Sequence, residues 1–188
     1  MNSKKYASGE IAKIEGVTVI YVISDKKTVP MDHVKFYNIV AASTLERILK
    51  YTEDLHTKVC VRFGHIRGFN HSSTLDYFNN RVWRLGNYDR LVDQPKWIFA
   101  ENNSGIQLAD REGNLRLSTT GSVEVQYAGI LGAAMNADRF GNFEPSYMET
   151  IKHQIRKSVD GEISRYGIKA ISANNDPKSF KWWIKGWV

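Results

Sequence analysis

The sequence predicts one α/β domain in which parallel strands alternate with helices. Short runs rich in β-branched and aromatic residues alternate, along the first half of the chain, with segments whose apolar residues recur at helical spacing. The resulting order of strand, helix, strand, helix, strand is typical of parallel strands joined by right-handed crossovers. With 188 residues and no internal repeat or low-complexity linker, the chain is long enough for one domain over residues 1–188.

The first strand is expected over residues 16–23, because this run is apolar at consecutive positions, as strands buried on both faces are. Pro30 interrupts the chain, and Asp32 is a suitable N-cap for a long helix that we expect to extend to about Leu55. Helical spacing predicts its buried face to consist of Phe36, Ile39, Val40, Leu45, Ile48 and Leu49.

A second strand is expected over residues 58–63. It contains Cys60, the only cysteine, which we interpret as a small buried side chain in a reducing compartment. Residues 74–85 carry apolar side chains at helical spacing and predict another helix, with Phe78 on its apolar face. A third strand is expected over residues 96–100.

The second half of the chain predicts two further helices. Residues 111–121 are polar and rich in Gly and Thr, which favours a loop or hairpin. Residues 123–137 are rich in small residues and predict a helix. Pro145 is placed near the first turn of another helix, expected to end at about Ser158.

Charge and composition favour a polyanionic partner. The formal net charge is +6, which raises the likelihood of a nucleic-acid partner. No apolar run approaches the roughly 20 residues that span a bilayer. The basic N-terminus is not followed by the apolar segment of a secretory signal. We therefore expect a cytoplasmic protein with no membrane partner.

Most familiar catalytic signatures are missing from the sequence. It has no phosphate-binding loop, no Gly-rich dinucleotide motif and no zinc-ligand spacing. His65 and His71 flank a polar loop at a strand end, a usual place for site residues in α/β sheets. Two histidines in one loop are more often exposed or hydrogen-bonded than metal ligands, so we assign them a supporting role at most.

Basic and aromatic residues interleave at two places in the chain. Such mixtures can follow phosphates and stack bases. Alternatively, the rings anchor their segments to the core while the charged groups stay in water. The two groups are Arg62, Phe63, Arg67 and Phe69, and Lys178, Lys181, Trp182, Trp183, Lys185 and Trp187.

Residues 97–110 carry the candidate catalytic side chains. The third strand leads to Glu101, an Asn/Ser/Gly turn follows, and a helix start would then present Gln107 and Asp110 on one face. An acid that leaves a strand and an acid that opens a helix can converge on one cation, and Mg²⁺ and Mn²⁺ prefer such hard oxygen ligands. Spacing alone favours the alternative, a helix that simply exposes Gln107 and Asp110 to solvent.

Residues 104–110 resemble the Gln-x-x-Asp motif of an uncharacterised bacterial and phage family, the domain-of-unknown-function family thirty-eight hundred of the ribonuclease H-like superfamily. The resemblance covers most of the chain, although its other parts are less specific than the motif. These parts are the strand at 17–23 followed by Asp25 and Lys26, the helix at 36–49, the strand at 59–63 and residues 140–147.

The resemblance implies a ribonuclease H-like fold, a mixed sheet flanked by helices, and metal-assisted hydrolysis of phosphodiesters. Two Mg²⁺ or Mn²⁺ ions would activate a water molecule and stabilise the leaving oxygen. Asp110 would be a metal ligand, Glu101 a second ligand and Gln107 an orienting hydrogen-bond partner.

The sequence departs from the family pattern in two respects. Members usually begin with a strand that carries an Asp-Glu pair, and nothing here matches it, so the resemblance implies a fold that lacks its first strand or strands. Members also follow the motif at once with a small-residue helix, which begins here near Gln126. The motif could therefore lie at Gln126 with Gly129 in place of the acid, which implies a dead site. We prefer Asp110, because Glu101 also fits.

We therefore expect a metal-dependent nuclease-like protein that acts on nucleic-acid phosphodiesters and is incomplete as this chain alone. The alternative is a non-catalytic nucleic-acid-binding or assembly subunit that retains the fold. The expected partners are DNA or RNA, and a second chain, identical or different, joined at the exposed edge of the strand at 17–23.

Overall fold

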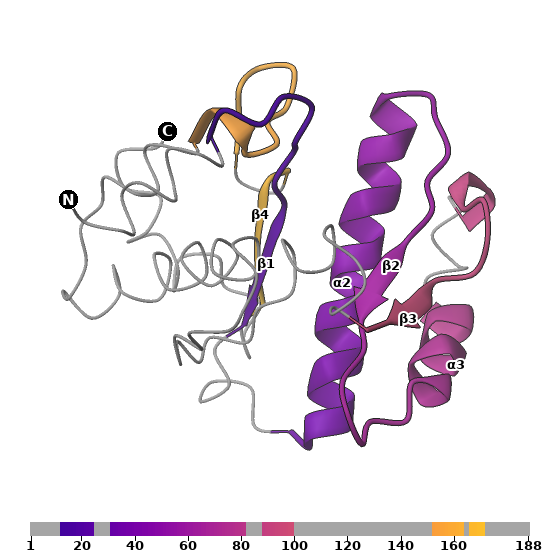
Figure 1. The fold of residues 1–188 in the computed structure, drawn as a ribbon. Coiled ribbons are helices and arrows are strands. Elements are labelled where there is room, and N and C mark those ends of the chain that lie inside the picture. The colour runs from indigo at the N-terminus through magenta and orange to yellow at the C-terminus, as the bar shows by residue number, and fades with distance from the viewer. Residues whose placement is uncertain (1–11, 25–30, 82–87, 100–151, 164–165, 172–188) are drawn as a thin grey trace, which may run out of the picture. The chain divides into compact units, whose positions relative to one another are not determined.

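The structure is a computed structural model, and it describes residues 12–24, 31–81, 88–99, 152–163 and 166–171 (Figure 1). These residues form helices and pairs of strands, so the predicted α/β class is confirmed. They divide into two compact units, each assembled from separate chain segments. The first unit holds residues 12–19, 63–65, 97–99 and 152–155, and the second holds the other described residues. The expectation of a single domain stays a prediction.

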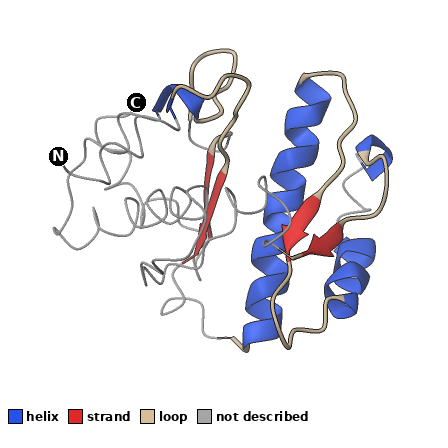
Figure 2. Ribbon diagram, in the orientation of Figure 1, coloured by secondary structure: helices blue, strands red, loops and turns tan. Residues whose placement is uncertain are grey.

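The long helix α2, His33–Asp54, is the main element of the second unit (Figure 2). Asp32 is its N-cap, as predicted, and its Oδ1 atom accepts a hydrogen bond from the backbone amide of Lys35 at 2.9 Å. This bond satisfies an amide that has no partner within the helix. The helix ends at Asp54 with Leu55 as its C-cap, close to the predicted end, and His56 then takes a left-handed backbone conformation with φ 51°.

The buried face of α2 differs in part from the predicted one. Leu45 and Leu49 are buried, as predicted, and Ala41 and Ala42 are buried beside them. The remaining predicted positions are only partly buried: Phe36, Ile39, Val40 and Ile48. The small side chains of the two alanines allow another element to approach the helix closely at this face, which apolar periodicity alone does not indicate.

Helix α3, Ser72–Arg81, packs against α2 within the same unit. Phe78 is fully buried, as predicted, and so is Thr74. The Thr74 Oγ1 atom donates a hydrogen bond to Asn38 Oδ1 of α2 at 2.7 Å. This bond offsets the cost of burying two polar side chains in the interface. The predicted continuation of this helix to residue 85 lies outside the described residues.

Strand β1, Tyr21–Ser24, pairs in parallel with strand β4, Ile168–Ile171. Their register places Tyr21 opposite Ile168 and Ser24 opposite Ile171. The sequence did not predict β4. The predicted first strand began earlier, at residue 16, but before β1 only Val19 makes a β-bridge, to Ile155.

Strand β2, Arg62–Gly64, pairs with strand β3, Lys96–Ile98. The Lys96 amide donates to the Val61 carbonyl oxygen at 3.2 Å, and the His65 amide donates to Ile98 at 2.9 Å. Both strands therefore advance in the same direction, as the sequence predicts. The strand predicted over residues 58–63 begins further along the chain than expected, at Arg62.

Two sheets of two strands each, β1–β4 and β2–β3, are present among the described residues. The only described partner of β1 is β4, so the expected joining of another chain at a β1 edge stays a prediction. Two short 3-10 helices, η2 at Tyr88–Arg90 and η4 at Lys152–Gln154, complete the described elements.

Two further predictions from the sequence are wrong. Cys60 is exposed rather than buried, because its neighbour Val61 is buried at 3% exposure and successive side chains of an extended segment alternate between faces. The helix expected to reach Ser158 does not extend that far, because its described residues form only the short 3-10 helix η4, Lys152–Gln154. The Val19 amide there donates to the Gln154 carbonyl oxygen at 2.8 Å, which directs this backbone into a β-bridge.

Within the described segments, no helix combines the length and the apolar character that crossing a bilayer requires.

Leu45→Ala should lower the free energy of unfolding by roughly 2–5 kcal/mol, because truncation leaves a cavity that the neighbouring side chains fill only in part. Leu45 is 0% exposed, whereas Val34 on the same helix is 44% exposed. Val34→Ala should therefore change the free energy of unfolding by less than about 0.5 kcal/mol. Urea unfolding followed by circular dichroism measures both, and equal effects would contradict the burial pattern of α2.

Candidate functional site

The predicted catalytic residues Glu101, Gln107 and Asp110 lie outside the described residues, as do the alternative motif positions Gln126 and Gly129. In the part of the chain that the structure describes, no group of three or more His, Cys, Asp or Glu side chains is placed to hold a metal ion. The Mg²⁺ or Mn²⁺ site therefore stays a prediction. The second basic and aromatic group, residues 178–187, also lies outside the described residues.

The described residues with the most distinctive chemistry lie on β2 and β3 and at the ends of these strands. The rings of Phe63 and Trp97 stack, with centroids 5.3 Å apart and planes inclined by 20°. Two residues further along each strand, the rings of His65 and Phe99 lie 4.3 Å apart. Side chains two residues apart on a strand point to the same face. These four residues therefore form two rungs on one face, which we name the aromatic ladder.

The ladder follows from the sequence pattern of both strands. Aromatic residues favour extended backbone, and each of these strands places rings at alternate positions. Aromatic pairs contribute about 0.5–1.5 kcal/mol beyond their buried area, so the two rungs stabilise the register of the strands. The His65–Ile98 backbone hydrogen bond, 2.9 Å long, keeps the strands together at the second rung.

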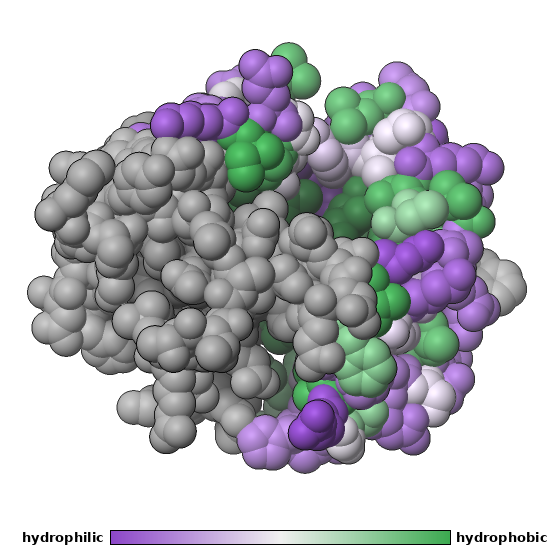
Figure 3. Space-filling view, viewed as in Figure 1, coloured by the Kyte–Doolittle hydropathy of each residue, from purple (hydrophilic) through white to green (hydrophobic). Residues whose placement is uncertain are grey.

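The ladder is partly open to solvent. Phe99 is 56% exposed, and Phe63, His65 and Trp97 are partly buried. Full burial of a phenylalanine side chain contributes roughly 1.5–3 kcal/mol, much of which Phe99 does not gain here. On the visible face, hydrophobic groups of the described part lie among hydrophilic ones (Figure 3). More than half of Phe99 is therefore accessible to solvent, beside the ring of His65.

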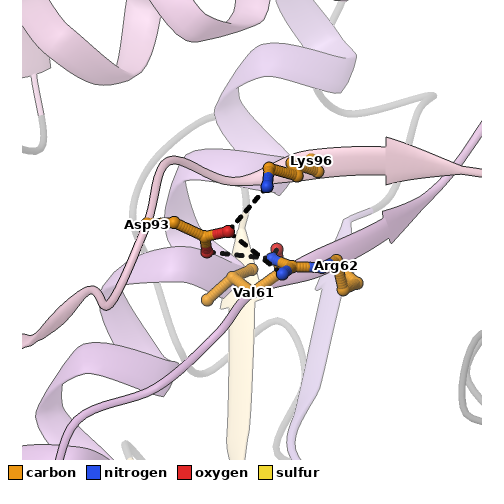
Figure 4. A network of polar contacts seen from close by, with 4 residues as sticks. All are labelled: Val61, Arg62, Asp93 and Lys96. Carbon is orange, nitrogen blue, oxygen red and sulfur yellow. Dashed lines mark hydrogen bonds and ion pairs between the residues drawn. The ribbon is translucent and has the colours of Figure 1, made fainter.

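An ion network lies on the same two strands and the turn before β3 (Figure 4). Arg62 donates two hydrogen bonds to the carboxylate of Asp93, at 3.0 and 3.1 Å, and the Lys96 Nζ atom lies 2.8 Å from Asp93 Oδ2. Arg62 also donates to the Val61 carbonyl oxygen at 3.0 Å. This geometry is the bidentate fork that suits arginine and a carboxylate.

The network lowers the pKa of Asp93 to about 2, mainly through the hydrogen bonds from Arg62 and then through those from Lys96. Two cations share one carboxylate, so the network retains a positive charge. Lys96 carries much of it to solvent, because its side chain is 60% exposed. Arg62, which the sequence grouped with phosphate-binding residues, instead has its guanidinium engaged by Asp93.

The loop after β2 is held by ring contacts. Phe69 packs against Tyr37 of α2, with ring centroids 4.6 Å apart, and against His71 at 5.2 Å. The Nε2 atom of His71 accepts a hydrogen bond from the Ile66 amide at 3.2 Å. His71 and Phe69 therefore shape the loop, which confirms the hydrogen-bonded alternative for this histidine. Arg67 in the same loop is exposed.

The sequence analysis named Phe63 and His65 separately but did not connect them with Trp97 and Phe99. The signal was present in the sequence, since both strand segments carry rings at alternate positions. Only the register of β2 against β3 shows that the two patterns meet.

Comparison of the chain with protein-family models, curated proteins and solved structures finds no match. The resemblance to the ribonuclease H-like family therefore stays an expectation from the sequence.

Asp93→Asn should lower the urea midpoint near neutral pH and have little effect at about pH 2, because the variant lacks the ionised partner of Arg62 and Lys96. The pKa of Asp93 is about 2 in the folded chain, against about 3.9 for an unfolded chain. The network therefore stabilises the fold above about pH 4, and this contribution is lost as the pH falls toward 2. Urea unfolding at several pH values measures the difference between the two proteins.

Arg62→Gln is the matching control for this titration. Removal of the main partner should raise the pKa of Asp93 toward its ordinary value and narrow the pH range over which stability is lost. If the difference in urea midpoint between wild type and Asp93→Asn is the same at pH 4 and at pH 2, the network does not form in solution.

Proposed function

We propose that this protein binds nucleic acid. The observation that carries the proposal is the aromatic ladder with its exposed Phe99 ring, in a chain of net charge +6. Stacking of a base on an aromatic side chain contributes about 1–3 kcal/mol and accepts every base, because each has a π face. Rings supply stacking and cations attract phosphates, and the chain offers both.

The charge supports the same conclusion. Lys58, Arg67 and Lys157 are exposed cations of the described segments. Phosphates of a bound strand release counterions when such side chains approach them, which gives affinity without a fixed geometry. A net positive protein also attracts a polyanion from a distance and speeds their encounter. The partner that fits is DNA or RNA.

Metal-dependent cleavage of the bound strand is a second candidate. It is supported by the resemblance of residues 104–110 to the Gln-x-x-Asp motif, and by Glu101, which follows Phe99 by two residues. Asp110 and Glu101 would hold Mg²⁺ or Mn²⁺, and Gln107 would orient a neighbouring group.

In this candidate the fold is ribonuclease H-like, and a second chain at the edge of β1 would supply the acids that the site needs beside Asp110 and Glu101. If the motif instead lies at Gln126, with Gly129 in place of the acid, the protein is a non-catalytic binding subunit.

Binding to nucleic acid should weaken as the salt concentration rises, because bound phosphates release counterions. For about two phosphate contacts, affinity should fall roughly tenfold between about 50 and 200 mM salt. Fluorescence anisotropy of a labelled oligonucleotide measures this change in affinity. Lack of binding to single and double strands at about 50 mM salt would remove the proposal.

Asp110→Asn should abolish cleavage in the presence of Mn²⁺ while leaving binding almost unchanged, because the substitution removes a metal-binding charge and keeps the size of the side chain. A nuclease assay on labelled single and double strands, run beside the binding measurement, separates the two effects. Cleavage by the variant at the wild-type rate would exclude Asp110 as a ligand. If the wild-type protein binds nucleic acid but does not cleave it, it acts as the non-catalytic binding subunit.

A further inference from the structure

We infer that the aromatic ladder binds a single strand of nucleic acid in an extended conformation, with one base at each rung. This inference rests on the proposed function and names its substrate class. It depends on the spacing of the rungs, on the exposure of Phe99 and on the chemistry of the four rings.

The spacing of the rungs differs from that of stacked bases. Phe63 and His65 lie two positions apart along one strand, and Trp97 and Phe99 lie two positions apart along the other. At about 3.3 Å per residue, the rungs are about 6.6 Å apart. Successive bases within one strand of a duplex are only about 3.4 Å apart. Two neighbouring bases can therefore occupy the two rungs only if they unstack from one another.

A duplex does not meet this requirement. Its base faces are covered by their neighbours along the helix, whereas a single strand can spread its bases and offer each face to a ring. Phe99 is the ring of the ladder that such a base reaches most readily, because it is 56% exposed whereas the other three rings are partly buried. The ladder therefore selects single strands over duplexes.

The rings of the ladder also indicate weak sequence preference. Phe63 and Phe99 have no hydrogen-bonding group on their side chains and cannot read the edge of a base. Recognition by stacking accepts every base. The two phenylalanine rings cannot hydrogen-bond to a 2′-hydroxyl group either, so stacking on them does not distinguish the two sugars, and single-stranded DNA and RNA should both bind.

The test is a binding experiment on the full chain at low salt. The probes are a labelled single-stranded DNA of mixed sequence, the RNA of the same sequence and the corresponding DNA duplex. We expect both single strands to bind at least about fivefold more tightly than the duplex, as the stacking of one base implies. Phe99→Ala should weaken single-strand binding by at least about fivefold, for the same reason, and leave duplex binding unchanged.

Three further variants separate stacking from other effects. Phe99→Tyr keeps the aromatic face and should bind as wild type does, whereas Phe99→Leu keeps an apolar side chain without a π face and should weaken binding as Phe99→Ala does. Val92→Ala removes another exposed apolar side chain, 61% exposed, and should leave binding unchanged. Urea unfolding of each variant confirms that the fold is intact.

The outcomes distinguish this inference from the proposed function. Salt-dependent binding that is equal for single strands and duplex, or that is insensitive to Phe99→Ala, would overturn the ladder as a single-strand site and leave nucleic-acid binding standing. Equal losses for Phe99→Tyr and Phe99→Leu would overturn stacking as the mode of contact. Lack of binding to all three probes would overturn both proposals.

Discussion

The buried guanidinium of Arg156 is the interaction on which the second unit depends. Arg156 is only 5% exposed, and it donates hydrogen bonds to the carbonyl oxygen of Arg47, at 3.1 Å, and to the carboxylate of Asp54. The rings of Tyr51 and Tyr166 lie 5.1 and 5.4 Å from its central carbon. An unpartnered buried cation is strongly destabilising, so all of these contacts must form together. The planar guanidinium suits both the hydrogen bonds and the ring contacts.

The contacts of Arg156 join the C-terminal half of α2 to the segment that leads into β4. Lys169 of β4 adds an ion pair to Glu46 of α2, with Nζ and Oε2 3.1 Å apart. Once β4 is held in this way, β1 can pair with it, although Tyr21 and Ile168 are far apart in the sequence. Closing so long a loop has an entropic cost that pairing over four residues does not offset alone.

This dependence explains which elements the sequence predicts well. Helix α2 is set by local chemistry, by the cap at Asp32 and by the helical spacing that buries Leu45 and Leu49, and both of its ends are predicted correctly. Strand β4 was missed because four residues carry little signal of their own and are ordered by distant partners. Cys60 was placed wrongly because an apolar run does not show which of its alternating side chains face inward.

The candidate site likewise contains features that the local sequence indicates and features that depend on distant contacts. The sequence analysis named Phe63 in a group of basic and aromatic residues and His65 at a strand end. The ladder, however, depends on the register between β2 and β3. Register is a non-local property, fixed by backbone hydrogen bonds such as that between Lys96 and Val61. Asp110 was selected through a motif and Glu101 because it follows the predicted third strand, and the placement of both acids stays a prediction.

The alternation of side chains along β2 and β3 also explains how a short strand pair could carry the proposed binding surface. A two-stranded sheet is marginal by itself and needs side-chain contacts between its strands. Phe63 and Trp97 supply them at one set of alternate positions, and Arg62 and Lys96, joined through Asp93, supply them at the other. The strands are therefore held before any ligand arrives. Under the proposed function, little ordering entropy would be lost on binding, and the energy of stacking on Phe99 would contribute directly to affinity.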